Sequence, residues 1–145
     1  MSTPSLSSLL IPSKAVDVDL PGHSGVTVNL AFISREELTK IRKKATKTKF
    51  NNRTRTLEEN LDEDMFLRLY TDATIKGWKG ITLGVLEKLT LVDISGHDLS
   101  MELPYSPDEA FLLMKNSAEF DSFVSETIND LSVFQKTSSK KPAAK

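Results

Sequence analysis

The chain has 145 residues, of which 39% are hydrophobic and 27% are charged, and its net charge is −1. This length and composition fit a single globular domain, and the near-zero net charge argues against a protein that is steered as a whole toward nucleic acid or a membrane surface. The absence of cysteine excludes disulfides, thiolate zinc sites and cysteine nucleophiles, and it suits a reducing cytoplasm.

The N-terminal sequence MSTPSLSSLLIPSK contains a short apolar stretch that Pro12 interrupts. No basic segment precedes this stretch, which argues against a signal peptide. No apolar run in the chain approaches the ~18 residues that a membrane helix needs. We therefore expect residues 1–14 to be a flexible N-terminal lead, and we expect no membrane partner.

Two runs of alternating apolar and polar residues follow, at 16–20 and 26–30, on either side of the turn sequence PGHSG. This pattern predicts a β-hairpin. Because an isolated hairpin is marginally stable in water, we expect its apolar face to pack on the rest of the domain.

A helix is predicted next, from about Arg35 to Lys47, because Ser34 and Glu37 have the spacing of a capping box. Leu38, Ile41 and Ala45 would share one face of this helix. The helix therefore has an apolar side that can contact the hairpin.

The segment 40–55 carries eight basic residues and no acidic one. It could be a nucleic-acid patch, a docking site for an acidic protein, or a solvated surface that neighbouring carboxylates compensate. We favour the compensated surface, because the next segment contains five acids and because only Phe50 could stack on a base.

A second capping-box pattern, at Thr56 and Glu59, predicts a helix that ends near Ile75–Gly77. Trp78 then lies at a junction, between Gly77 and Gly80. We favour the interpretation that its indole closes the end of the core, and the alternative is an exposed anchor for a partner.

The Leu-rich segment 83–91 could be a short helix or a strand, and we favour the helix. Ser106 and Pro107 then start a clear helix that ends near Asn116. Ser117 caps a final helix that includes Phe134, and the polar, basic end 135–145 is expected to be disordered. The predicted fold is mainly α: an N-terminal β-hairpin packed on a bundle of about four to five helices in a single domain.

Residues for catalysis are few. His23 and His97 are the only histidines, each in a predicted loop, and they do not make a metal-site signature. The chain contains no Walker-type phosphate loop and no nucleophile elbow. We therefore expect a protein that is not an enzyme and that uses no cofactor and no metal.

Three segments together resemble a known family. IKGWKGI at 75–81, LPYSPDEAFLLM at 103–114 and SAEFDSFVSETI at 117–128 are similar to the tail assembly chaperones of long-tailed bacteriophages. The resemblance covers roughly residues 15–134 and is sharpest over 75–128. It implies a chaperone-like domain at 15–134, between the N-terminal lead and the basic tail.

The resemblance implies a factor in the host-cell cytoplasm that is absent from the mature virion. Such a protein binds and solubilises the tape-measure protein, helps recruit tail-tube subunits, and can self-associate. One alternative is a minor tail component, a connector or terminator, that stays in the virion. The other is a small nucleic-acid-binding regulatory protein that uses 40–55, although nucleic acid is not the partner we expect.

Five residues are candidates for contact with a partner. Trp78 is the predicted junction anchor, and Tyr105 could present both its ring and its hydroxyl. The side chains of Lys43, Lys44 and Lys47 could steer an acidic client toward the protein.

Overall fold

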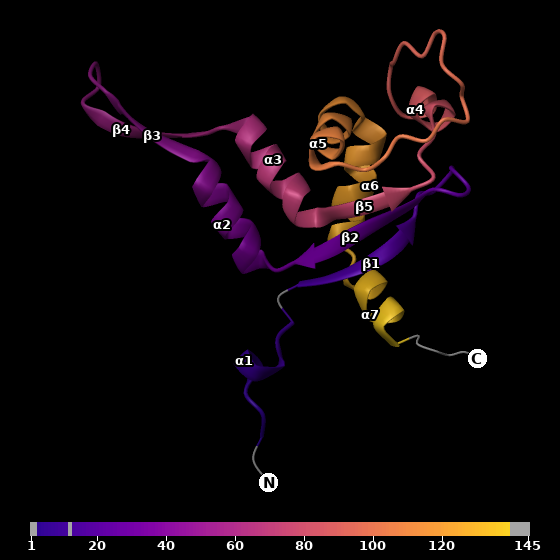
Figure 1. The fold of residues 1–145 in the computed structure, drawn as a ribbon. Helices are drawn as coiled ribbons and strands as arrows, with labels where there is room; N and C mark the ends of the chain where they lie inside the picture. The colour runs from indigo at the N-terminus through magenta and orange to yellow at the C-terminus, as the bar shows by residue number, and fades with distance from the viewer. Residues whose placement is uncertain (1–2, 12, 140–145) are drawn as a thin grey trace.

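The computed structural model of the protein describes residues 3–11 and 13–139 (Figure 1). Helices make up 45% of the chain and strands 25%, in seven helices and two sheets among these described residues. The predicted mainly α bundle is therefore wrong, and the fold is α+β. The prediction failed at two segments that form strands. Residues 56–61 were expected to begin a helix, and residues 75–79 were expected to be a helix end followed by a junction.

The larger sheet has three antiparallel strands in the order β1-β2-β5. Strand β1 (Ser13–Asp19) pairs with β2 (Thr27–Ile33) along its whole length, which confirms the predicted hairpin. Strand β5 (Ile75–Lys79) pairs with the other edge of β2. The hairpin is thus part of a larger sheet and not an addition to a helical bundle.

Strand β5 corrects the prediction that a helix ends near Ile75–Gly77. Helix α3 (Glu63–Thr74) ends at Thr74, and the chain continues directly as a strand in which Trp78 lies opposite Val28. Ile75 and Trp78 have side chains that favour strands, and β2 offers them an unpaired edge. Trp78 therefore lies inside a strand and not at a junction between helices.

The other helices begin at the predicted caps. Ser34, Ser106 and Ser117 each accept a hydrogen bond from the backbone N–H three residues on, at 3.1 Å. These caps start α2, α5 and α6, and the short helix favoured in the Leu-rich segment is present as α4. The bounds of these helices are α2 (Arg35–Ala45), α4 (Leu83–Leu89), α5 (Pro107–Asn116) and α6 (Ala118–Ile128).

The predicted final helix is divided in two. Helix α6 ends at Ile128, and α7 (Leu131–Ser139) begins after a break in which the carboxylate of Asp130 accepts a hydrogen bond from the N–H of Ser132 at 3.1 Å. Helix α7 overlaps the first part of the predicted tail 135–145. Residues 140–145 lie outside the described residues.

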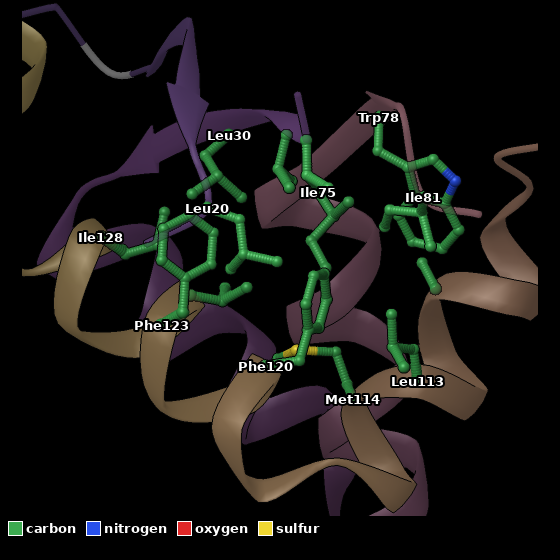
Figure 2. Close-up of a cluster of buried hydrophobic side chains, with 14 of the residues drawn as sticks. Leu20, Leu30, Ile75, Trp78, Ile81, Leu113, Met114, Phe120, Phe123 and Ile128 are labelled. Carbon is green, nitrogen blue, oxygen red and sulfur yellow. The ribbon is translucent and has the colours of Figure 1, made fainter. Parts of the chain in front are cut away.

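The core lies between the three-stranded sheet and helices α3, α5 and α6 (Figures 1 and 2). Figure 2 shows Phe120 of α6 reaching toward Ile75 of the sheet, with Trp78 and Ile81 beside it. The largest fully buried apolar side chains in this core are Phe120, Leu30, Ile75, Ile81, Val26, Val28 and Val124.

The N-terminal segment lies outside this core. Helix α1 (Leu6–Leu9) is a single turn without a buried residue, and Leu10 and Ile11 after it are also exposed. Among the described residues, no helix has both the length and the apolar character that crossing a membrane would require.

Candidate protein-interaction surface

A two-stranded hairpin projects from the body between α2 and α3 (Figure 1). It consists of β3 (Thr46–Asn51) and β4 (Thr56–Leu61), and we call it the arm. The predicted helix start at Thr56 and Glu59 is wrong, because both residues lie in β4. The N-cap of α3 is Asp62 instead, whose carboxylate accepts a hydrogen bond from the N–H of Met65 at 3.1 Å.

Local sequence explains why this segment forms a hairpin. The residues from Thr46 to Phe50 alternate in the sequence TKTKF, which matches the period of a strand. The side chain of Asn51 closes the turn, since its oxygen accepts hydrogen bonds from the N–H groups of Arg53 at 2.9 Å and Thr54 at 3.3 Å. Arg55 completes the turn with a φ of 60°, a conformation that asparagine or glycine usually supplies.

The strand register divides the arm into two unlike faces, because residues directly opposite each other share a face. The apolar face carries Phe50 opposite Leu57, and the charged face carries Lys49 opposite Glu58. Phe50 is 53% exposed and Leu57 is 70% exposed. The remaining pairs are Thr46–Leu61 and Thr48–Glu59 on the apolar face, and Lys47–Asn60 and Asn51–Thr56 on the charged face.

No part of the chain that the structure describes covers the apolar face of the arm. Neither strand of the arm contains a buried residue. A hairpin of two strands is marginally stable in water when nothing packs on it, and its two outer edges can accept a further strand. The arm therefore exposes both an apolar face and unpaired backbone groups to other molecules.

The base of the arm is held to the body by polar contacts. The N–H of Asp62 donates to the carbonyl oxygen of Ala45 at 2.7 Å, and Lys47 Nζ lies 3.1 Å from Asp62 Oδ2. The guanidinium of Arg42 lies 5.2 Å from the centre of the Phe66 ring. The N–H of Met65 and then the ammonium of Lys47 lower the pKa of Asp62 below its ordinary value. These contacts join α2 and the start of α3 at the base of the arm.

The three predicted lysines lie beside this base. Lys43 and Lys44 are exposed in the last turn of α2, and Lys47 is in the first part of β3. Of the eight basic residues in 40–55, only Lys47 has an ion pair among the residues that the structure describes. The predicted compensation by neighbouring acids is thus limited to one salt bridge at the base of the arm.

Trp78 and Tyr105 are brought together, but in the core and away from the arm. The indole of Trp78 is 8% exposed, and its Nε1–H donates to the carbonyl oxygen of Leu103 at 2.9 Å. Its ring meets that of Tyr105 edge-on at 5.3 Å, and the Tyr105 hydroxyl donates to the carbonyl oxygen of Ile75 at 3.1 Å. Burial raises the pKa of Tyr105. In this structure both side chains pack at the edge of the core. Their role as anchors for a partner stays a prediction.

Phe50 and Leu57 are a surface pair that was not predicted from the sequence. The alternation TKTKF, followed by the turn sequence NN, was the signal that could have revealed a hairpin here. The eight basic residues of 40–55 also fit a helix end or phosphate contacts, and in that setting Phe50 is a residue that could stack on a base.

The two histidines lie in loops outside the arm. His23 Nε2 lies 3.0 Å from a carboxylate oxygen of Glu119, and its side chain is 9% exposed. His97 lies in the loop after α4. Within residues 3–11 and 13–139, no group of three or more histidine, aspartate or glutamate side chains is arranged so that it could hold a metal ion.

The fold and its surface define an α+β protein with a projecting, amphipathic arm. The model of the YdaY prophage protein family matches residues 33–145, and the chain belongs to this family. It is therefore a phage-derived protein. The matched range starts at the last residue of β2 and includes the arm. No curated protein and no solved structure matches the chain.

Proposed function

We propose that this protein is a phage tail assembly chaperone that binds and solubilises the tape-measure protein and helps recruit tail-tube subunits while the tail is built. Membership in a prophage protein family supports the viral setting. The resemblance of residues 75–128 to tail assembly chaperones supports the role in tail assembly. The chaperone acts in the host-cell cytoplasm and leaves before the virion matures.

The uncovered apolar face of the arm is the observation that carries this proposal. A long helical client exposes amphipathic stripes until its final partners cover them, and a chaperone needs apolar surface of its own to cover them in the meantime. Phe50 and Leu57 offer such surface on a hairpin that does not take part in the core. The arm can therefore bind and release a client without a change in the rest of the fold.

The basic residues at the base of the arm favour a client with acidic segments. Lys43 and Lys44 end α2 next to the arm. Exposed charges of one sign increase the rate at which an oppositely charged partner meets the surface, and they affect the final affinity less. The lysines would thus bring the client to the apolar face that holds it.

Co-expression with the tape-measure protein of the same phage tests the proposal. We expect the full chain to raise the soluble fraction of the client and to copurify with it. The double variant Phe50→Ser/Leu57→Ser should lose both effects, because it removes the apolar pair of the arm. The control Leu91→Ser/Leu99→Ser, which changes two other exposed leucines, should keep them.

Two results would contradict the proposal. If the wild-type chain neither binds nor solubilises the tape-measure protein, the chaperone function is wrong. If mass spectrometry finds the chain at a fixed ratio to the other proteins of purified virions, the alternative of a minor tail component replaces it.

The nucleic-acid alternative rests on one observation, that seven of the eight basic residues in 40–55 lack an ion pair among the described residues. Binding of duplex DNA through several phosphates weakens steeply with salt. Fluorescence anisotropy with labelled DNA at rising salt therefore separates this function from client binding through an apolar face.

A further inference from the structure

An acidic groove lies between the end of β1 and the helices α6 and α7. It has a volume of about 460 Å³, and its lining includes the four carboxylates of Asp19, Glu119, Glu126 and Asp130 and no lysine or arginine. Its apolar lining comes from Val18, Leu20, Phe123 and Val133. The groove thus combines apolar side chains with four carboxylates.

We propose that the acidic groove binds the arm of a second copy of this chain. The turn at the end of the arm has the complementary charge, because Arg53 and Arg55 lie in it next to the paired Phe50 and Leu57. Lys49 lies on the opposite face of the arm, and Glu59, which shares the face of Phe50 and Leu57, lies farther from the turn. The two apolar side chains would contact the apolar lining of the groove, and the two arginines would lie near its carboxylates. Opposite charges placed around an apolar contact fix its register and exclude partners of the wrong charge.

The arm cannot reach the groove of its own chain. Figure 1 shows the arm at one end of the molecule and the turn between β1 and β2 at the other. Leu20 and Pro21, at the end of β1 beside this turn, line the groove. The docked arm must therefore come from another copy.

This contact joins two different surfaces, so the copies associate head to tail. A head-to-tail contact produces a closed ring when the rotation between copies closes, and an open chain when it does not. Because exposed charges contribute to the contact, salt should weaken the association. The inference does not depend on the identity of the client, but client and second copy would compete for the same arm.

Sedimentation velocity of the purified full chain tests the inference. We expect the average mass to rise above that of the monomer as the protein concentration increases, and to fall again at high salt. The arm variant Phe50→Ser/Leu57→Ser and the groove variant Asp19→Lys/Glu126→Lys should each remain monomeric. The control Glu87→Lys, on the exposed surface of α4, should associate like the wild type.

Mixing the two monomeric variants distinguishes this contact from others. The arm variant keeps an intact groove and the groove variant keeps an intact arm, so the mixture should form a one-to-one dimer that cannot grow. Circular dichroism checks the folding of each variant, and Asp19→Asn/Glu126→Gln is the milder groove variant if charge reversal disturbs the fold.

Three results would overturn the inference: a wild-type chain that stays monomeric at every concentration, a mixture that forms no dimer, or a folded groove variant that still associates. The last result would mean that the arms pair with each other. None of these measurements contains a client, so they succeed or fail independently of the proposed chaperone function.

Discussion

Strand β2 in the body and strands β3 and β4 in the arm differ in what covers their apolar side chains. In β2, Val28 and Leu30 are fully buried beneath helices. In the arm, Phe50 and Leu57 are mostly exposed. Alternation of apolar and polar residues usually marks a surface that will be covered. We infer from this difference that another molecule covers the arm. Four predictions test the contrast between the buried body and the exposed arm.

The largest effect is expected for Phe120→Ala. This ring is fully buried and meets Trp78 edge-on at 6.1 Å. The loss of a buried aromatic ring leaves a cavity and typically costs about 3–5 kcal/mol of the free energy of unfolding. Urea denaturation followed by circular dichroism measures this loss. A change below about 1 kcal/mol, smaller than core truncations usually give, would contradict the placement of Phe120 in the core.

A smaller effect is expected for Trp78→Phe, which removes the N–H donor to the carbonyl oxygen of Leu103. A lost hydrogen bond that leaves a partly buried acceptor unpaired costs about 1–3 kcal/mol. Tyr105→Phe removes the bond to the carbonyl oxygen of Ile75 and should act in the same direction. Unfolding in urea measures the stability of both variants. An unchanged midpoint for both would contradict the claim that these two hydrogen bonds stabilise the fold.

The base of the arm should loosen in acid. The pKa of Asp62 is lowered by the N–H of Met65 and by Lys47. The carboxylate therefore stabilises the fold above its unfolded pKa near 3.8, and this contribution is lost as the pH falls through the lower pKa of the folded state. Carbon-detected NMR should give a titration midpoint for Asp62 below 3.8. A midpoint at or above this value would contradict the two hydrogen bonds.

The smallest effect is expected for Phe50→Ala and Leu57→Ala. Neither side chain is buried in the monomer, so each substitution should change the free energy of unfolding by less than about 0.5 kcal/mol, as is usual for surface sites. The measurement belongs at low protein concentration, where the copies do not associate. A loss similar to that of Phe120→Ala would show that the arm packs on its own chain.

The local features of the fold could be predicted from the sequence. The hairpin of β1 and β2 and the helix starts at Ser34, Ser106 and Ser117 follow from residues close to one another in the chain. Pairing between β2 and β5 could not be predicted in this way, because it joins segments that α2, the arm and α3 separate. The glycines around Trp78 indicated a junction, yet the open edge of β2 decided the structure there.

The arm shows why local patterns can mislead. The sequence TLEE at 56–59 satisfies the capping-box rule, and leucine and glutamate favour helices. The same residues form part of β4, and pairing with β3 satisfies their backbone groups. For the candidate site, the structure places Lys43, Lys44 and Lys47 beside the arm, and their steering of a client stays a prediction. The alternation TKTKF and the turn sequence NN could have indicated the hairpin, whereas the pairing of Phe50 with Leu57 depends on the register of the two strands.

Because the arm adds nothing to the core, its turn is a place where the chain can be cut without separation of the two parts. Arg53 and Arg55 lie in this exposed turn, where trypsin can reach them. The two fragments would remain joined by the pairing of β2 with β5 and by the packing of α6 on β2. The protein could thus be divided there into complementing halves that reassemble, with the joining point far from the core.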